Sequence, residues 1–366
     1  MKFNTDYQTI IEKIEKINPF KYGHTRNYID GDITYLSPYI SRGFISSKQV
    51  LESLLKHEND YAKLEKFVQQ LVWREYFQRI WESKGEAINE DLKEQQQQVH
   101  NHGVAKAITT HQTGIVALDK AVMELYETGY IHNHSRMYLA SLACNVAKSY
   151  WKMPAKWMYY NLLDADWASN TCSWQWVAGS FSTKKYYANQ NNINRYTRSF
   201  QEQTFLDYSY EDLVNIAVPK RISEIETLDF QTVLPISENF ELDKSKATLL
   251  YNAYNLDVLW HQGEDFNRVL LLEPSHFEKY PMCAKTIDFI LALAKNIEGI
   301  QLFCGEFAEL KIKQDTANFV YKYHPAFLHY EGTGEERDWI FAEVSGYYPS
   351  FFSYWRKCES YFRKMI

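Results

Sequence analysis

Apolar residues recur every three or four positions through most of residues 1–206, a spacing that places them on one face of a helix. The clearest case is residues 61–81, where leucine, phenylalanine and valine follow this spacing between charged residues. The same pattern predicts a helix around residues 118–126 and a long one over residues 132–150, ended near Pro154. The first part of the chain is therefore predicted to be mainly helical.

The pattern changes after about residue 247, where short apolar runs replace the helical spacing. A helical pattern over residues 284–296 separates two of these runs. Strands that alternate with helices are typical of a parallel sheet covered by helices. The predicted strands are residues 247–251, 268–272, 300–303 and 318–321.

These two patterns predict a multidomain α and α/β fold. Residues 1–206 would form an all-helical domain. Residues 207–245, with scattered prolines and acidic residues, would form a linker. Residues 246–366 would form a small Rossmann-like domain with a parallel α/β arrangement.

Charge is distributed unevenly between these parts. The whole chain carries a net −6, from 40 basic and 46 acidic residues. Residues 1–206 hold 24 basic and 21 acidic residues, a net +3, and residues 207–366 carry the remaining −9. A net +3 permits contact with a polyanion such as DNA, but it is far from the strongly basic footprint of a dedicated nucleic-acid binder.

Composition places the chain among ordinary globular proteins, because 45% of its 366 residues are hydrophobic and 23% are charged. No apolar run approaches the roughly 18 residues of a membrane span. Residues 1–16 carry charges through their apolar stretch, unlike a signal peptide. We therefore expect a cytoplasmic protein without a membrane partner.

No metal centre is expected. The five cysteines stand too far apart for a CxxC pair, which argues against zinc, iron–sulfur and disulfide frameworks. His132 and His134, two residues apart, would point to different faces of a helix. Aromatic residues make up 16% of the chain, with 10 Trp and 28 Tyr, which suggests stacking or electron transfer beside their usual role in the core.

Carboxylates and tryptophans are densest at residues 164–176. Local sequence alone favours helix capping and solvent exposure for Asp164 and Asp166, with Asp166 as the N-cap. Arg136 is expected in a structural ion pair with a buried carboxylate, and Trp73 in the packing of its helix. Because GxGxxG and Walker motifs are missing, side chains and helix N-termini would have to hold the phosphates of any bound nucleotide.

Four motifs together resemble the flavin domain of the photolyase/cryptochrome family. They occur in the family's order and spacing, and the resemblance covers roughly residues 20–200. It implies that the helical domain, residues 1–206, holds FAD in a bent conformation. The motifs are LSPYISRGFIS (36–46), LVWREYF (71–77), TGYIHNHSRM (128–137) and LLDADWASNTCSWQWVAGS (162–180).

The resemblance also implies a set of FAD contacts. Asp164 would pair with Arg136 near the isoalloxazine ring, and Asn170 matches the position that faces flavin N5. A neutral amide there can hydrogen-bond a reduced flavin without opposing its negative charge. The implied FAD-binding residues are Tyr22, Thr34, Leu36, Ser37, Arg74, Arg136, Asp164, Asp166 and Asn170.

A substrate pocket is implied beside the flavin. Trp73 and Trp176 would be aromatic walls on which a flipped-out pyrimidine dimer stacks. Asn133 and Met137 match the enzymes that act on cyclobutane dimers, whereas (6-4) enzymes would be expected to carry histidine at both positions. Gln70 corresponds to the glutamate that contacts the dimer in typical repair enzymes.

Two further departures from the family pattern concern electron transfer and phosphate binding. Trp174 and Trp151 match the first two members of the family's tryptophan chain, but the third position falls near Gln98. Either a tyrosine is the terminal donor or photoreduction is inefficient. The phosphate-contacting TSRLS motif appears as ITYLS at residues 33–37, so other groups hold the phosphates or FAD binds more weakly.

Residues 246–366 resemble the α/β antenna domain that precedes the flavin domain in other family members. The resemblance implies a circular permutation, and the alternative is an unrelated α/β domain. Whether a second, antenna chromophore binds, and which one, stays open. The segments that carry the resemblance are LLYNAYNLDVLW (249–260), IQLFCGEFAEL (300–310), YHPAFLHYEGTGEERD (323–338) and YPSFFSYWRK (348–357).

The motifs together imply a deoxyribodipyrimidine photo-lyase, an FAD-dependent and blue-light-driven enzyme that repairs cyclobutane pyrimidine dimers by electron transfer from reduced flavin. Its partner would be damaged DNA. The alternative is a cryptochrome-type blue-light sensor without repair activity, with a signalling partner that the sequence does not identify. Gln70, the incomplete tryptophan chain and the acidic C-terminal half favour the sensor.

Overall fold

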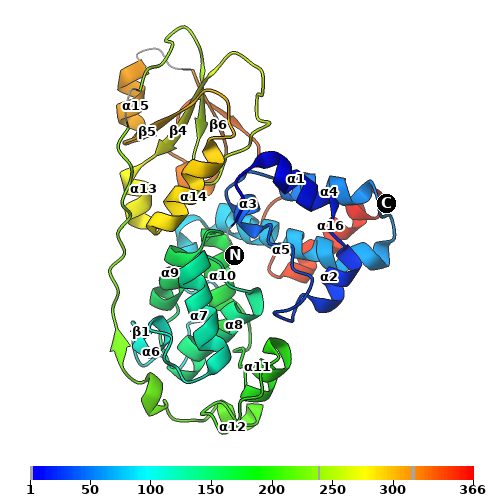
Figure 1. Ribbon diagram of the computed structural model, residues 1–366, viewed down its shortest axis with the longest axis vertical. Helices are drawn as coiled ribbons and strands as arrows, with labels where there is room; N and C mark the ends of the chain where they lie inside the picture. Colours follow the sequence, from blue (N-terminus) through cyan, green and yellow to red (C-terminus); the bar gives the residue numbers. More distant parts are fainter. Residues whose placement is uncertain (1–2, 238–239, 315–317) are drawn as a thin grey trace.

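The chain folds into a helical part and a part built on a parallel sheet, as the hydrophobic pattern predicted (Figure 1). The computed structural model describes residues 3–237, 240–314 and 318–366. Over these residues, no helix is both long and apolar enough to cross a membrane. The elements of residues 7–226 are α1 (Tyr7–Glu15), α2 (Pro19–Thr25), α3 (Ser37–Ser41), α4 (Ser47–Leu55), α5 (Tyr61–Lys84), β1 (Val104–Ala105), α6 (Lys106–Thr109), α7 (Val116–Thr128), α8 (Asn133–Ser141), α9 (Lys152–Asn161), α10 (Trp167–Ala178), α11 (Gln190–Thr197), α12 (Tyr210–Leu213) and β2 (Ile225–Glu226).

Helix α5 is the central element of the helical part. It confirms the helix predicted over residues 61–81 and runs for 24 residues. Asp60 caps it by accepting a backbone N–H of the first turn at 2.9 Å, and Gly85, with φ of 52°, ends it. Buried residues lie on several sides of α5 because α2, α10 and α16 (Phe351–Phe362) all pack against it.

The helix predicted over residues 132–150 is shorter than expected, and that part of the prediction is wrong. Helix α8 ends at Ser141 and is followed by a single π-helical turn, Leu142–Val146. The chain then turns at Lys148, whose φ of 58° lies outside the helical region. Pro154 lies in the first turn of α9, where its missing N–H costs no hydrogen bond.

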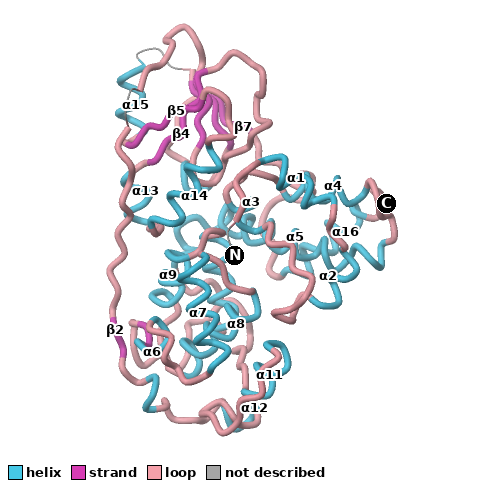
Figure 2. The backbone as a smooth tube through the Cα atoms, in the orientation of Figure 1, coloured by secondary structure: helices cyan, strands magenta, loops and turns pink. Residues whose placement is uncertain are grey.

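The second part is a five-stranded sheet in which every neighbouring pair of strands is parallel, in the order β5-β4-β3-β6-β7 (Figure 2). The four predicted strands and the predicted helix are all present. The sequence pattern missed β7 because it is short and polar. The elements are β3 (Thr248–Tyr251), β4 (Asn267–Leu272), α13 (Pro274–Lys279), α14 (Ala284–Ala294), β5 (Ile300–Cys304), α15 (Phe307–Gln314), β6 (Phe319–Lys322) and β7 (Thr333–Glu335).

The strand order has a switch point between β3 and β6. From β3 the chain adds β4 and β5 on one side, and then returns to add β6 and β7 on the other. In open α/β sheets the loops at the carboxyl ends of such a strand pair diverge and leave a crevice. In this molecule, those ends face the helical part through residues such as Tyr254, which hydrogen-bonds Tyr159 of α9 at 2.6 Å.

Residues 207–245 connect the two parts with little regular structure in the described range. Figure 1 shows this segment along one side of the molecule, from α12 to the sheet. It is held by side chains: Tyr160 donates to the Gln231 carbonyl at 3.1 Å, and Thr232 Oγ1 accepts the Met282 N–H at 2.9 Å. These two contacts fasten the middle of the segment to α9 and to the chain just before α14.

The C-terminal helix α16 returns to the helical part (red in Figure 1). Phe351, at its start, stacks on Trp73 of α5 with ring centroids 3.7 Å apart and an interplanar angle of 7°. Near its end, Glu359 accepts the Tyr61 hydroxyl at 2.7 Å. The end of the chain thus buries aromatic surface on α5.

The sheet core offers a direct test of the fold. Leu250 lies on the central strand β3 and is fully buried. Leu250→Ala should lower the free energy of unfolding by about 2–5 kcal/mol, because it leaves a cavity between packed layers. Ile312→Ala is the control, since Ile312 is 80% exposed on α15 and the change should stay within about 0.5 kcal/mol. Urea denaturation followed by circular dichroism measures both, and equal midpoints would contradict the assigned core.

Candidate functional site

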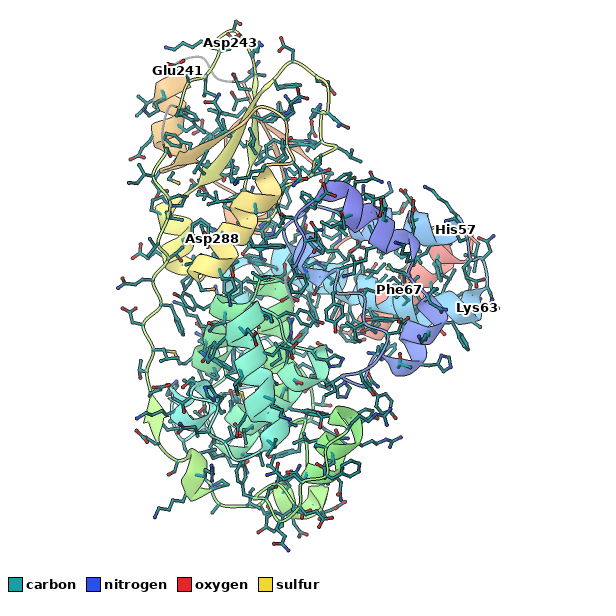
Figure 3. All side chains as sticks on the ribbon, in the orientation of Figure 1. His57, Lys63, Phe67, Glu241, Asp243 and Asp288 are labelled. Carbon is teal, nitrogen blue, oxygen red and sulfur yellow. The ribbon has the colours of Figure 1, made fainter. Side chains whose placement is uncertain are left out.

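A cavity of about 540 Å³ lies within the helical part. Its volume falls in the range of roughly 300–1,000 Å³ that small-molecule and cofactor sites occupy. Phe67, labelled in Figure 3, belongs to the wall formed by α5. Residues of α2, α8, α9 and α10 and the segment 33–37 form the other walls.

The cavity brings together residues that are far apart in the sequence. Every predicted cofactor residue and every predicted substrate residue lines it. Trp174 also lines it, whereas Trp151 does not. The predicted residues in the lining are Tyr22, Thr34, Leu36, Ser37, Gln70, Trp73, Arg74, Asn133, Arg136, Met137, Asp164, Asp166, Asn170 and Trp176.

Asp164 is buried and paired with Arg136. Its side chain is shielded, with the residue only 7% exposed, and Arg136 Nη2 lies 3.0 and 2.8 Å from its two carboxylate oxygens. Arg136 Nε donates to the Ile131 carbonyl at 2.9 Å, which fixes the guanidinium. The expected ion pair is confirmed, but the expected solvent exposure of Asp164 is wrong, because the segment between α9 and α10 lies in the interior.

Asp166 is buried as well, at 3% exposure, so the same expectation is wrong for this residue. It does cap α10 as predicted, by accepting the Ser169 N–H at 2.7 Å. Arg74 Nη2 lies 3.2 Å from Asp166 Oδ2, and Gln78 Nε2 donates to the same oxygen at 2.5 Å. Three donors therefore compensate one buried carboxylate.

The charge of the lining favours an anionic ligand. Its arginines outnumber its aspartates by one. His132 adds no charge near pH 7, because burial and the neighbouring Arg136 lower its pKa to about 4. The charged residues of the lining are Arg26, Arg74, Arg136, Asp164 and Asp166, and Arg26 was not among the residues singled out from the sequence.

Several polar groups in the lining are held in place or lack a partner. The Asn170 amide donates to the Ala155 carbonyl at 2.9 Å, which fixes its orientation on α10. Ser169 Oγ is buried and has no hydrogen-bond partner within the protein. A buried hydroxyl without a partner is costly, so a ligand in the cavity would satisfy it.

The two predicted aromatic walls differ in exposure. The ring of Trp73 is covered on one face by Phe351. Trp176 is 39% exposed and packs against Tyr186 with ring centroids 5.8 Å apart. Trp176 therefore offers the more open surface for stacking.

The two predicted electron-transfer tryptophans lie in different surroundings. Trp151 is fully buried at the start of α9, and its Nε1 donates to Asp91 at 2.8 Å. Its ring centroid lies 5.7 Å from that of Tyr150, which is partly exposed. At the predicted third position, Gln98 accepts a hydrogen bond from Lys148 at 3.2 Å.

Tyr35 is a lining residue whose importance the sequence did not reveal. Its φ of 53° is uncommon for a residue with a side chain, and such strain is often found at ligand sites. Its ring lies 5.2 Å from that of Tyr130, another lining residue. The available signal was the position of Tyr35 inside the altered ITYLS motif, where it appeared only as a departure from the family pattern.

The residues that the structure describes contain no candidate metal site. No group of histidine, cysteine, aspartate and glutamate side chains there is arranged to hold a metal ion. The five cysteines are all free, and three of them, Cys144, Cys172 and Cys358, are buried.

Comparison with known proteins agrees with the position of the cavity. Residues 67–209 match the family described as the FAD binding domain of DNA photolyase. The chain is 30% identical over 182 residues to a deoxyribodipyrimidine photo-lyase of Agrobacterium fabrum. The match covers 46% of this chain and 37% of the relative. It is 24% identical over 208 residues to a cryptochrome DASH of Synechocystis, covering 53% and 42%. The chain spans less than half of the length of these curated relatives.

A solved structure with a related sequence is a cryptochrome of Synechocystis sp. PCC6803. It is 22% identical, with a TM-score of 0.46, and the match covers 54% of this chain and 44% of that one. A class III photolyase from Agrobacterium tumefaciens is also 22% identical, with a TM-score of 0.40 and coverage of 52% and 44%.

A second cavity, of about 110 Å³, lies at the carboxyl ends of β3 and β6, next to Arg74 and Asp166. It is much smaller than a site for a cofactor-sized ligand. Glu75 lines it and is 5% exposed, and its Oε1 accepts the Ile340 N–H at 2.7 Å. Burial raises the pKa of Glu75 to about 7.

The raised pKa of Glu75 predicts a pH dependence of stability. The folded state favours the protonated carboxyl, whereas the unfolded chain ionises above its ordinary pKa of 4.5, so stability falls as pH rises through 7. Glu75→Gln cannot ionise, and its unfolding free energy should fall by roughly 2.5 kcal/mol less than that of the wild type between about pH 5 and 8. Glu52→Gln, at an exposed position, is the control. Parallel pH profiles for the wild type and Glu75→Gln would refute the assignment.

Proposed function

We propose that this chain, whose residues 67–209 match the FAD binding domain of DNA photolyase, is a light-driven DNA photolyase acting on cyclobutane pyrimidine dimers. The observation that carries the proposal is the single cavity of about 540 Å³. It holds both the residues implied for the cofactor and those implied for the substrate. A base that entered it would therefore meet the cofactor directly.

The cavity fits FAD. Arg26, Arg74 and Arg136 supply positive charge for a ligand with a diphosphate, and Ser169 Oγ offers a buried hydroxyl without a partner. Reduced FAD, excited by blue light, would supply the electron that opens the dimer. The residues that would hold it are Tyr22, Thr34, Leu36, Ser37, Arg74, Arg136, Asp164, Asp166 and Asn170.

The protein's contribution is to position these groups and to keep charges in place. The Asp164–Arg136 pair would face the isoalloxazine ring, with Arg136 fixed by the Ile131 carbonyl. Asn170, fixed by the Ala155 carbonyl, would present its neutral amide to flavin N5. A neutral group at this point avoids repulsion of a negatively charged reduced ring.

The substrate would enter next to Gln70, Asn133, Met137 and the two tryptophans. Gln70 Oε1 accepts a hydrogen bond from Arg26 at 3.4 Å, which places a cation beside the amide that replaces the family's glutamate. The damaged base pair would stack on Trp176, the more exposed of the two tryptophans. Flipping the dimer out of the DNA costs less than flipping intact bases, which is one source of selectivity.

Electrons would reach the cofactor through Trp151 and then Trp174, which lies in the cavity lining. We propose Tyr150 as the terminal donor, because its ring contacts Trp151 and is partly exposed. Once Trp151 has given up an electron toward the cofactor, Tyr150 would return one electron to it and release the phenolic proton, and Asp91 is the neighbouring carboxylate that would accept that proton. Tyr150 would then take the place of the family's third tryptophan, whose position falls near Gln98 in this chain.

Residues 246–366 are proposed to correspond to the α/β domain that other family members carry before the flavin domain. The parallel sheet with its switch point at β3 and β6 supports this correspondence. The proposal concerns the order of the domains.

The second candidate function is a flavin light sensor that does not repair DNA. Gln70 favours it, because an amide cannot donate a proton or stabilise positive charge as a carboxyl group can. The cryptochrome DASH relative shows that proteins with that name share this part of the sequence.

A repair assay separates the two functions. FAD-loaded, chemically reduced protein is illuminated with blue light in the presence of an oligonucleotide that contains one cyclobutane dimer, with a dark sample as the control. Chemical reduction makes the assay independent of the electron-transfer route. Light-dependent recovery of normal pyrimidines is the expected result. Bound FAD without any repair would refute the photolyase and favour the sensor.

The stacking surface makes a second prediction. Trp176→Ala should weaken binding of a dimer-containing oligonucleotide by roughly 1–3 kcal/mol, because it removes the open aromatic plane. Phe200→Ala is the matched control, since Phe200 is 94% exposed and lies outside the cavity lining. Fluorescence anisotropy in the dark measures both affinities. An unchanged affinity for Trp176→Ala would exclude Trp176 as the stacking wall.

A further inference from the structure

We propose that Arg337, from the C-terminal part of the chain, positions the Asp166 carboxylate through the side-chain amide of Gln78, and thereby influences the reduction potential of the bound flavin. The inference rests on the proposed function in one respect, namely that Asp166 lies beside the flavin. Arg337 and Gln78 are positioning residues in this scheme, and neither of them lines the large cavity.

The relay consists of two hydrogen bonds in series. Gln78 is 5% exposed on α5, and its Nε2 donates to Asp166 Oδ2 at 2.5 Å. Its Oε1 accepts from Arg337 Nη1 at 2.8 Å. Only one orientation of the amide satisfies both neighbours, because the reversed amide would turn its oxygen toward the carboxylate and its NH₂ group toward the guanidinium. Arg337 therefore decides which way Gln78 faces Asp166.

Arg337 is itself held in place by α5. Its Nη2 donates to Glu82 at 3.1 Å, and its guanidinium lies over the ring of Trp339, 4.4 Å from the ring centroid. Arg79 lies over the same ring at 3.5 Å and pairs with Glu82 at 3.0 Å. Arg337 thus has a partner for its charge in Glu82 of α5 and a partner for its flat face in Trp339 of its own segment.

Helix α5 presents two different surfaces. Glu75, Gln78, Arg79 and Glu82, spaced three or four residues apart, contact the segment 337–340. Other α5 residues, such as Phe67, Gln70 and Arg74, line the cavity on an adjoining face of the helix. Asp166 lies where the two surfaces meet, because Arg74 and Gln78, four residues apart on α5, both contact its Oδ2. A residue distant in sequence therefore acts on the edge of the flavin cavity.

Removal of Arg337 should make the flavin harder to reduce. Without the guanidinium, Gln78 loses the group that fixes its amide, and Asp166 loses compensation for its charge. The negative potential at the cavity would rise, which disfavours a reduced flavin that carries a negative charge. The reduction potential should therefore fall in Arg337→Met and, for the same reason, in Gln78→Met.

The test is a redox titration of the full-length, FAD-loaded protein, followed by its visible absorption. The potential is expected to fall in Arg337→Met and in Gln78→Met, and Arg337→Met should add less in the Gln78→Met background than it does alone. Arg79→Met is the matched control, because it disturbs the same Trp339 and Glu82 contacts without touching Gln78. Its potential should equal that of the wild type. An unchanged potential in Arg337→Met, or an equal shift in Arg79→Met, would overturn the relay.

The design keeps this inference separate from the proposed function. If Arg337→Met does not fold, Gln78→Met alone decides the matter, because an unchanged potential in that folded, FAD-bound variant also overturns the relay. The titration requires bound FAD but no repair. If the variants show the expected shifts in potential and the protein repairs no dimer, the relay is supported and the photolyase function is refuted. If the protein repairs dimers and the variants show no shift, the photolyase function is supported and the relay is refuted.

Discussion

The burial of two carboxylates, Asp164 and Asp166, is the constraint on which the rest of the site depends. A buried carboxylate without partners costs several kcal/mol, so each must be paired and hydrogen-bonded. Arg136 of α8 pairs with Asp164. Arg74 of α5 pairs with Asp166, Gln78 of α5 donates a hydrogen bond to it, and Asp166 also caps α10. These pairs fix α5, α8 and α10 relative to one another, and the cavity is the space that this arrangement encloses.

The sequence predicted the features that local spacing encodes and missed the features that depend on contacts in the folded chain. Helix α5 and the four predicted strands follow from local hydrophobic spacing, which neighbouring residues encode directly. The early end of α8 involves a π-helical turn at Leu142–Val146 and, after it, a left-handed residue, Lys148, which no spacing shows. The burial of Asp164 and the stacking of Phe351 on Trp73 depend on segments far away in the chain, so local sequence suggested exposure for the first and was silent on the second.

The candidate site shows the same division. The family resemblance named half of the residues that line the cavity, because each motif carries several of them within a few positions. Arg26, Tyr35 and Ser169 line the cavity without having been singled out, since only the folded chain brings them to it. The contribution of Arg337 could not be predicted from the sequence, because Arg337 contacts Gln78 across the boundary between the two parts. Helix α5 joins these parts physically, so the α/β part belongs to the environment of the cavity.

If FAD occupies this cavity, a variant that fills the cavity should exclude FAD. Ser173 lines the cavity from an exposed position on α10, so Ser173→Trp places a bulky ring in the space without disturbing the core. Ser360→Trp, at an exposed position on α16, is the control. The measurement is the stoichiometry and affinity of FAD, with circular dichroism to verify folding. We expect one FAD per chain for the wild type and for Ser360→Trp, and binding at least about tenfold weaker, or 1.4 kcal/mol, for Ser173→Trp. Wild-type affinity in a folded Ser173→Trp protein would contradict FAD binding in this cavity.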